Sequence, residues 1–595
     1  MFLVLKSKKY HFKDRHSIDY SMFSWKKSTL LSIIFISLIA SAQKEGNLFI
    51  SPLKIPLSLS ASFGELRPDH YHSGIDIKTQ GVTGKEVVAS DGGFVYQLLV
   101  SPAGFGKAIF LRHPSGYSTV YCHLDHFTPE IDEYVKTKQY ENKSFAVTIY
   151  PPEGRFGIKK GETIGFSGNS GSSSGPHLHF EIRRSDGEKP VNPLLFNFEI
   201  EDNLKPVIER LAVYQISDNT TINGKGGNLY FNLTGADGNY SLPEDTELRI
   251  SGLAGFGVGS HDFMNGTPNK FGINSIELQI DSIPWFSYEI NEFSFFESRY
   301  INAHIDYEAT LRNNIDIEKA FSLPNDKLSL YKNFMNNGLY DFNDSKTHFV
   351  KIIVRDGKNN RAALSFYVKP GLTKASINGM HPDSSNRIMP YDKSNFFETN
   401  GVKVIIPEGA LYDTLHFKFL RSDGNGRLLS DIYHIHNRYT PVQKPIKLLI
   451  KPDRIPPGKE SKLILVQIDE NKKVSFAGGS FSDGYISADI LSFGDYAVSV
   501  DTIPPVIFTN GFTDGEDLSE KKEIRVKITD NFSGIKAYTG IIDGKWALFE
   551  YDPRYDLLVY KFDLSRISRS TKHKLYLRVT DNCNNSAALT REFFW

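Results

Sequence analysis

Two short segments of the chain combine side chains that bind metal ions. The first runs from His72 to Asp76 and reads His-Ser-Gly-Ile-Asp, and the second reads Gly-Pro-His-Leu-His-Phe-Glu over residues 175–181. Together they offer two or three imidazoles and one carboxylate, which is the ligand set of a catalytic zinc site. If the two segments meet in the fold, the sequence predicts a metal-dependent hydrolase.

The spacing within each segment favours an extended backbone. His177 and His179 are two residues apart, so in a strand both side chains lie on one face, while the intervening leucine and the following phenylalanine point into a core. A strand without chemistry typically carries Thr, Ser or Lys on its exposed face, so this pair favours a functional role. His72 and Asp76 also return to one face of an extended chain, although H-x-G-x-D alone is a weak pattern.

A third segment supplies another histidine. Residues 117–124 read Tyr-Ser-Thr-Val-Tyr-Cys-His-Leu, which predicts a strand with His123 near its end. Residues 161–171, ahead of the two-histidine strand, read as a hairpin and a loop of small residues. Such a loop lets the backbone approach a polypeptide substrate.

In this order, the three motifs resemble those of the lysostaphin/LytM-type zinc endopeptidases, which cut peptidoglycan cross-bridges. The resemblance covers residues 60–197 and implies that zinc (Zn2+) is the cofactor. All five motif side chains are present, which argues against the inactive relatives that only activate other enzymes. The resemblance implies that the zinc ligands are His72, Asp76 and His179, and that the catalytic residues are His123 and His177.

The implied roles agree with the chemistry of these residue types. Three protein ligands leave a position for water, and zinc lowers the pKa of that water towards ~7 and polarises the scissile carbonyl. Either His123 or His177 accepts the proton of the water, and the other stabilises the oxyanion or protonates the leaving amine. With histidine as the base, activity is predicted to fall at acid pH, so a rate that stays flat down to about pH 4 would contradict this assignment.

Other polar side chains near the motifs have simpler interpretations. His70 is expected at the surface, and His113 and His126 are expected to be structural rather than catalytic. Glu181 follows His179 on the same face of the predicted strand. It either supports the ligand from behind or is a surface carboxylate.

The chain as a whole predicts several mostly β domains. Its 595 residues exceed what one core holds, and its 69 Lys+Arg balance 69 Asp+Glu, which gives no sign of a nucleic acid or anionic membrane partner. Aromatic residues reach 13% and favour strands. We predict an antiparallel β-sheet zinc peptidase domain followed by β-sandwich modules. The predicted divisions are 1–42 (signal peptide region), 43–200 (peptidase, with a helix-bearing insertion at 128–157), 201–370, 371–500 and 501–595.

An internal repeat separates the later domains. Residues 354–364 match residues 579–589 without a gap, and a Pro-Val-Ile triplet precedes each copy, at 206–208 and 505–507. The second copy has about ninety residues, the size of an immunoglobulin-like sandwich. The first is longer, and we expect an aromatic insertion around residues 285–296. Residues 371–500, between the copies, contain no cluster of His, Cys or paired acids and predict a binding or spacer module.

The N-terminus predicts export to the periplasm or the cell exterior. Lys26 and Lys27 precede an apolar run over residues 30–40, and small residues then favour cleavage before Gln43. Met22 is a second possible start. The alternative is an uncleaved membrane anchor. No cysteine follows the run to accept a lipid, and no later segment is long enough to cross a membrane.

The two cysteines predict free thiols. Export would permit a disulfide, but Cys122 and Cys583 fall in different predicted domains, so two buried thiols are expected. Because side chains alternate along a strand, Cys122 is expected to face the core if His123 faces a cleft.

The sequence therefore predicts a secreted zinc metalloendopeptidase that cleaves peptide stems or cross-links of bacterial peptidoglycan. Its expected partners are peptidoglycan peptides, with no nucleic acid and no transmembrane segment in the mature chain; the β modules are expected to bind the wall or a protein partner. One alternative is a non-catalytic scaffold that holds the wall or a partner. The other is a zinc protease that acts on Gly-rich proteins.

Overall fold

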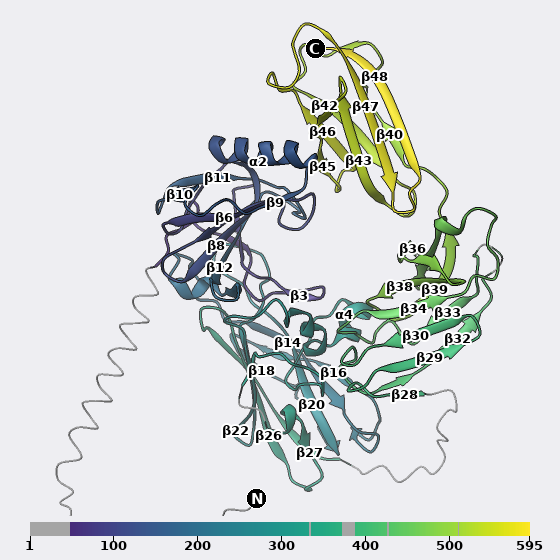
Figure 1. The fold of residues 1–595 in the computed structure, drawn as a ribbon. Helices are drawn as coiled ribbons and strands as arrows, with labels where there is room; N and C mark the ends of the chain where they lie inside the picture. The colour runs from purple at the N-terminus through teal and green to yellow at the C-terminus, as the bar shows by residue number, and fades with distance from the viewer. Residues whose placement is uncertain (1–47, 333–334, 372–386, 425, 427, 510) are drawn as a thin grey trace, which may run out of the picture. The chain divides into compact units, whose positions relative to one another are not determined.

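The computed structural model describes residues 48–332, 335–371, 387–424, 426, 428–509 and 511–595 (Figure 1). The predicted export signal lies outside these ranges. Strands make up most of the regular structure, which confirms the predicted mostly β fold. Within the described ranges, no helix has the length and apolar character needed to span a membrane.

An eleven-stranded sheet carries the motif residues. Its main path has the order β1-β4-β12-β8-β7-β6-β10, and four further strands pair off this path. The main strands are Leu59–Ala61 (β1), Ile75–Lys78 (β4), His177–Arg184 (β12), Tyr117–Phe127 (β8), Lys107–Arg112 (β7), Gly93–Val100 (β6) and Gly157–Ile158 (β10). The others are Glu86–Val88 (β5), Val147–Ile149 (β9), Thr163–Ser167 (β11) and Lys189–Val191 (β13), while Leu66–Arg67 (β2) pairs only with His70–Tyr71 (β3).

Apolar side chains on one face fix the register of the three central strands. Ile75 and Ile77 of β4 and Leu178 of β12 are fully buried, as the alternation in sequence predicts. β12 pairs antiparallel with both β4 and β8, which places His179 opposite Asp76 on one side and opposite Cys122 on the other. The register that buries these apolar residues therefore also brings two of the three chemical motifs together.

The predicted insertion contains the predicted helix. Helix α2 spans Pro129–Asn142, with proline at its first position and Thr128 before it. A proline is favoured there because the first helical N–H has no partner within the helix. The helix ends at Lys143 in a left-handed conformation, and a 3-10 turn at Pro193–Phe196 (η2) follows the sheet.

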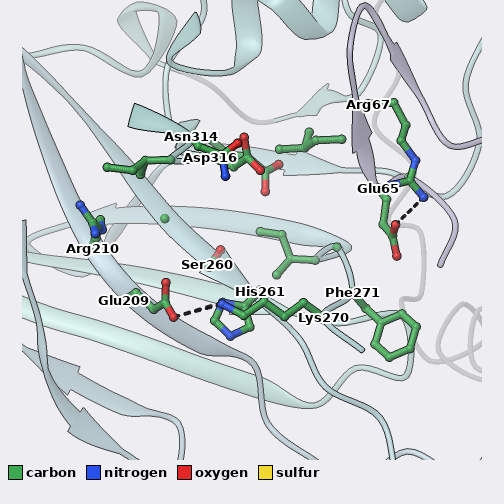
Figure 2. Close-up of a pocket in the computed structure, with 17 residues that line it drawn as sticks. Glu65, Arg67, Glu209, Arg210, Ser260, His261, Lys270, Phe271, Asn314 and Asp316 are labelled. Atoms are coloured by element: carbon green, nitrogen blue, oxygen red, sulfur yellow. Dashed lines mark hydrogen bonds and ion pairs between the residues drawn. The ribbon is translucent and has the colours of Figure 1, made fainter. Parts of the chain in front are cut away.

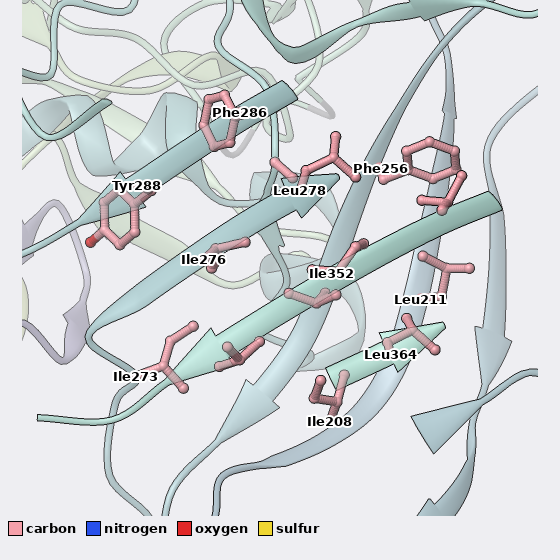
Figure 3. Packing of buried hydrophobic residues seen from close by; sticks show 14 of the residues in the cluster. Ile208, Leu211, Phe256, Ile273, Ile276, Leu278, Phe286, Tyr288, Ile352 and Leu364 are labelled. Atoms are coloured by element: carbon pink, nitrogen blue, oxygen red, sulfur yellow. The ribbon is translucent and has the colours of Figure 1, made fainter. Parts of the chain in front are cut away.

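The first copy of the repeat is a two-sheet sandwich. One sheet has the order β16-β14-β20-β23 and the other β15-β19-β27-β26-β21-β22-β24. Figure 3 shows its buried core, to which Ile208, Leu211 and Phe256 come from the first sheet and Ile276 and Ile352 from the second. The strands are Val207–Gln215 (β14), Thr221–Ile222 (β15), Leu229–Asn232 (β16), Thr234–Ala236 (β17), Asn239–Ser241 (β18), Leu248–Ser251 (β19), Leu253–His261 (β20), Ser275–Ile280 (β21), Ile283–Glu289 (β22), Glu318–Lys319 (β23), Tyr331–Lys332 (β24), Tyr340–Asp341 (β25), His348–Arg355 (β26) and Arg361–Pro370 (β27).

The expected aromatic insertion at residues 285–296 is only partly correct. Its first part is β22, a strand of the second sheet that pairs with β21. The added length of this copy includes the turns and short helices that follow: Ser298–Tyr300 (η3), Ile301–His304 (α3), Tyr307–Asn313 (α4) and Asn336–Gly338 (η4). The aromatic residues were misassigned because a strand packed on a core also favours aromatic side chains.

A second sandwich follows, with the strand orders β29-β30-β34-β38-β37 and β32-β33-β39-β35-β36. Its core includes Val404, Leu448 and Tyr496. The strands are Arg387–Met389 (β28), Asn395–Thr399 (β29), Val402–Ile406 (β30), Leu415–Phe417 (β31), Phe419–Ser422 (β32), Ile432–Ile435 (β33), Ile446–Ile450 (β34), Leu463–Ile468 (β35), Val474–Phe476 (β36), Ser480–Ser482 (β37), Tyr485–Ile490 (β38) and Gly494–Val500 (β39), with a 3-10 turn at Glu460–Lys462 (η5).

The last sandwich repeats the topology of the first. Its sheets have the orders β40-β42-β46-β45 and β41-β48-β47-β43-β44. In both copies the strand that begins at Pro-Val-Ile pairs with a later strand of the same sheet, β14 with β20 and β40 with β42. The last two strands of each copy form a long hairpin, β26 with β27 and β47 with β48. The strands are Val506–Phe508 (β40), Glu516–Asp517 (β41), Glu523–Thr529 (β42), Ile535–Ile542 (β43), Lys545–Ala547 (β44), Glu550–Asp552 (β45), Leu557–Lys561 (β46), Lys572–Asp581 (β47) and Ser586–Phe594 (β48).

Candidate metal centre

Three side chains from the two motifs converge on one point. His72 Nε2 lies 3.0 Å from His179 Nδ1 and 3.2 Å from Asp76 Oδ1, and the last two atoms are 2.9 Å apart. His72 and His179 are buried, and Asp76 is mostly so. The structure thus brings together the three predicted zinc ligands, although their role as ligands stays a prediction.

Hydrogen bonds behind the two imidazoles fix which nitrogen faces this point. His72 donates from Nδ1 to the backbone oxygen of Ser62 at 2.6 Å, so its Nε2 lone pair faces inward. His179 Nε2 lies 2.9 Å from Oε1 of Glu181, so its Nδ1 faces inward. Partners of this kind hold a ring in the tautomer and orientation that a metal requires.

The donor set fits a zinc ion. Two imidazole nitrogens and one carboxylate oxygen are common zinc ligands, and tetrahedral bonds of about 2.0–2.2 Å place such atoms roughly 3.3–3.6 Å apart. The observed separations of 2.9–3.2 Å are close to that spacing. Without a positive charge between them, the lone pairs of these three atoms would face and repel one another.

The ionisation of these groups also favours a positive charge at the site. Burial alone would lower the pKa of His179, but hydrogen bonds to Asp76 and Glu181 raise it to about 9. Burial would raise the pKa of Asp76, yet His72 and His179 hold that pKa well below its usual range. A cation at this point is therefore stabilised by its surroundings.

Glu181 lies beside His179 on the same face of β12 and supports its ring on the side away from the three converging atoms. Its carboxylate is fully buried and accepts hydrogen bonds from Ser73 at 2.6 Å and from Arg183 at 2.5 Å, in addition to its contact with His179. Burial would raise the pKa of Glu181, but Arg183 and His179 hold it at about 2. Of the two interpretations of this residue, the structure supports the one in which it positions the ligand.

Replacing Glu181 with glutamine is expected to weaken zinc binding by about 10- to 100-fold, because His179 loses the charged partner that orients it. It also removes the closer of the two carboxylates that pair with the buried Arg183 and leaves only Glu188 at 3.7 Å, so the free energy of unfolding should fall by about 1–3 kcal/mol. Competition with a chromophoric chelator measures the affinity. The matched control is Ser73→Ala, which keeps the carboxylate; equal zinc affinity in all three proteins would contradict the assigned role.

His123 reaches the site from a bulge in β8. Its backbone is left-handed, with φ of 59°, and the pairing of β7 with β8 shifts register between Lys107 and Ile109. Bulges next to active sites re-aim side chains, and a left-handed non-glycine residue costs about 1–3 kcal/mol. Cys122 is fully buried and packs with Val120, and both cysteines are free, as predicted. The expectation that Cys122 and His123 point to opposite faces is wrong: Cys122 lies opposite His179 on the face that carries the site, and the bulge turns His123 to that same face.

Both remaining motif histidines present a free Nε2 near the three-residue cluster. His123 donates from Nδ1 to the Ser170 carbonyl at 2.8 Å, and His177 donates from Nδ1 to the Gly175 carbonyl at 2.8 Å. Their rings lie 4.8 Å apart, and His177 Nε2 is 3.6 Å from Asp76 Oδ1. Burial, followed by the charges of His179 and His177, lowers the pKa of His123 to about 3, so this imidazole is neutral at neutral pH and can accept a proton.

The glycine of H-x-G-x-D is required by close backbone packing. A Cβ at Gly74 would lie 2.3 Å from the carbonyl oxygen of Phe180, which is much closer than atoms approach in folded proteins. Gly74 therefore lets the segment between His72 and Asp76 lie directly against β12. This contact explains why the motif combines two ligands with a glycine.

Replacing Gly74 with alanine is expected to destabilise the fold by about 1–3 kcal/mol, as overpacking generally does, and to displace both flanking ligands. Thermal unfolding and zinc content measure the two effects. Gly157→Ala is the matched control because nothing lies within 4 Å of a Cβ there. The explanation fails if Gly74→Ala binds zinc and melts like the control.

The other histidines agree with their simpler interpretations. His70 is exposed, and His126 stacks on Phe166 near the surface. His113 is buried between the Gly92 carbonyl and Thr119, a structural role. Sequence reasoning missed Phe105, whose ring stacks on His179 at 5.6 Å, because no motif includes it.

A separate cavity of about 410 Å³ contains none of the five motif residues (Figure 2). Its lining carries both signs of charge, including Glu65, Arg67, Glu209 and Lys270. Two ion pairs cross its wall, Arg67 with Glu65 and His261 with Glu209. Its charged side chains largely pair with one another, so we assign no chemistry to it.

A buried site of two imidazoles and a carboxylate, flanked by two further histidines on an antiparallel sheet, is typical of a metallopeptidase. Residues 70–140 and 153–193 match the model of peptidase family M23, and residues 386–501 match that of the Zu5-like domain. The chain therefore carries a peptidase family M23 domain, which confirms the predicted resemblance. The interruption at residues 141–152 falls within the predicted insertion.

Curated relatives resemble about a quarter of the chain. An uncharacterized metalloprotease of Haemophilus influenzae is 34% identical over 131 residues, which are 22% of this chain and 21% of the relative. A DD-carboxypeptidase/endopeptidase of Neisseria meningitidis is 31% identical over 157 residues, 26% of this chain and 30% of the relative. The chain thus spans less than a third of either relative. The catalytic domain of lysostaphin from Staphylococcus simulans, a solved structure, is 22% identical, with 24% of this chain and 92% of that one covered and a TM-score of 0.18.

Proposed function

We propose that the sheet domain is a zinc-dependent metalloendopeptidase that cleaves peptide stems or cross-links of bacterial peptidoglycan, and that the chain is exported to the periplasm or cell exterior. The observation that carries the proposal is the convergence of the inward-facing nitrogens of His72 and His179 with Asp76 Oδ1, 2.9–3.2 Å apart. The name of the Neisseria relative, a DD-carboxypeptidase/endopeptidase, supports the peptide chemistry.

The five motif residues divide into those that would bind zinc and those that can transfer a proton. Zinc, held by His72, Asp76 and His179, would supply a water of lowered pKa and polarise the scissile carbonyl. His123 and His177 both keep Nδ1 on a backbone carbonyl, so each presents Nε2 for proton transfer. One of them would accept a proton from that water, and the other would stabilise the oxyanion or protonate the leaving amine.

The loop that holds His123 also forms one boundary of the site. The Ser170 hydroxyl donates a hydrogen bond to the Leu124 carbonyl at 2.7 Å. The Ser170 carbonyl accepts a hydrogen bond from Nδ1 of His123. A Cβ on Gly171 would lie 2.3 Å from the Gly106 nitrogen, so the loop packs tightly against a second glycine-rich segment. This packing holds the imidazole in place before a substrate arrives.

The test is digestion of purified muropeptides by the zinc-loaded full chain, with mass spectrometry of the products. Cleavage within a peptide stem or cross-link is expected, and the masses identify the bond. A protein that holds one zinc per chain yet leaves every muropeptide and wall preparation intact would contradict the proposal and support the scaffold alternative. Cleavage of Gly-rich proteins alone would support the protease alternative.

A further inference from the structure

The two copies of the repeat place three aspartates at equivalent positions. The first aspartate of each copy lies four residues before the Pro of Pro-Val-Ile, the second directly follows β20 or β42, and the third lies at the turn of the final hairpin. The first copy contributes Asp202, Asp262 and Asp356, and the second Asp501, Asp530 and Asp581. In each copy, one carboxylate oxygen from each residue lies within 4.8 Å of the other two.

The same hydrogen bonds hold both clusters. Asn360 donates through its side-chain amide to the carboxylate of Asp356 at 2.8 Å and to the backbone oxygen of Asp202 at 3.2 Å. Its counterpart Asn585 donates to Asp581 at 2.7 Å and to the backbone oxygen of Asp501 at 3.1 Å. Each asparagine thus ties the segment that leads into the sandwich to the final hairpin, so the clusters are built rather than accidental.

Asp262 is a fully buried carboxylate whose hydrogen-bonding capacity is not met. Its side chain is 0% exposed, and neither of its oxygens makes a well-formed hydrogen bond. One oxygen each of Asp202 and Asp530 is also buried and unpaired. Burying a carboxylate without partners costs several kcal/mol, on the order of the whole stability of a small domain, so an orphan of this kind needs an explanation.

Ionisation at the first cluster shows the same deficit of positive charge. Burial, then Asp356 and Asp202, raises the pKa of Asp262 to about 8, and the Phe263 N–H opposes this only in part. Burial and Asp356 raise the pKa of Asp202 to about 6. Three acids held this close repel one another unless a proton or a cation lies among them.

Ion pairs do not supply that charge in the part of the chain that the structure describes. Within the described ranges, none of the six aspartates forms an ion pair within 4 Å with a Lys, Arg or His side chain. Lys358 faces the first cluster, where burial lowers its pKa, but the matching position of the second copy is Cys583. A lysine is therefore not the feature that the two clusters share.

We propose that each cluster binds a calcium ion that fastens the segment leading into a sandwich to the final hairpin of that sandwich. The three converging ligand atoms of each cluster are all carboxylate oxygens, which suits a hard cation better than zinc, and calcium accepts carboxylates together with backbone oxygens and waters. Asp202 follows the end of the peptidase match at residue 193, and Asp501 is the last residue of the Zu5-like match. Calcium would thus stiffen two junctions between domains.

The test is equilibrium dialysis of the full chain against radioactive calcium, after chelating resin has removed metals and zinc has been restored to one equivalent. Extracellular calcium modules bind at about 0.1–1 mM, so dialysis extends to several times that concentration. Two ions are expected for the wild type, one each for Asp262→Asn and Asp530→Asn, and none for the double variant. The matched control, Asp245→Asn, removes an exposed carboxylate of the first sandwich and should keep two ions.

Folding is monitored separately from binding. Asparagine keeps the shape of the acid, and Asp262 is largely protonated at neutral pH without a cation, so the calcium-free variants should melt like the wild type. Calcium should raise the melting temperature of the wild type and not that of the double variant. Absence of calcium binding by the wild type, or a stoichiometry that neither substitution lowers, would overturn the proposal.

Discussion

His179→Ala is expected to lose both bound zinc and hydrolysis of peptidoglycan. The substitution removes one of three ligand atoms and also the group that Glu181 holds in place at 2.9 Å. Activity should fall by more than 10⁴-fold, to the background of the uncatalysed reaction in the assay, because zinc held at this site would supply the water that attacks the peptide bond. Zinc content by mass spectrometry and release of muropeptide fragments measure the two effects on one sample.

Three comparisons separate loss of the metal from loss of the fold. His126→Ala removes a partly exposed histidine of the neighbouring strand β8 and should leave zinc content and rate unchanged. Wild-type protein stripped by a chelator should match His179→Ala in rate, and added zinc should restore only the wild type. His72→Ala should behave like His179→Ala because both nitrogens face the same point. Full activity in either ligand variant would exclude the assignment.

The ligand motif was predictable from sequence because strand periodicity connects spacing to geometry. A period of two places His177 and His179 on one face, and the buried Ile75 and Leu178 then allow one register for β4 and β12. The same rule was insufficient for His123. Its left-handed backbone and the bulge around it depend on the hydrogen bond from its own N–H to Phe105, a contact between distant segments. Alternation alone gives the wrong face there, because Cys122 already lies opposite His179 on the face of the site and only the bulge brings His123 to it.

Two further features depend on contacts that sequence does not display. The sequence does not indicate that Glu181 contacts Arg183 and Ser73, since a strand carboxylate at that spacing is equally common at a surface. The burial of all three residues in the fold identifies this interaction. The repeat itself was evident from its matching turns. Its acidic clusters were not, because Asp262 and Asp530 belong to loops of different length and become equivalent only through the topology of β20 and β42.

His177→Ala and His123→Ala are expected to keep one zinc per chain and to lose hydrolysis by about 10²–10⁴-fold, the usual contribution of a general acid or base. Neither side chain supplies one of the three converging ligand atoms, and each presents a free Nε2. The contrast with His179→Ala is the decisive result, because it separates neighbours on one strand by function. Loss of zinc in His177→Ala would instead make that residue a ligand.

A glycine at position 123 adds a test of the strained backbone. His123→Gly and His123→Ala both lack the imidazole, so their hydrolysis rates should be equally low. Their stabilities should differ, since a left-handed conformation costs an L-residue roughly 1–2 kcal/mol that glycine avoids. Chemical denaturation is therefore expected to show His123→Gly as the more stable of the two. Equal stabilities would mean that the bulge relaxes once the imidazole is gone. In that case the hydrogen bond from the imidazole to the Ser170 carbonyl would be what holds the backbone in the left-handed conformation.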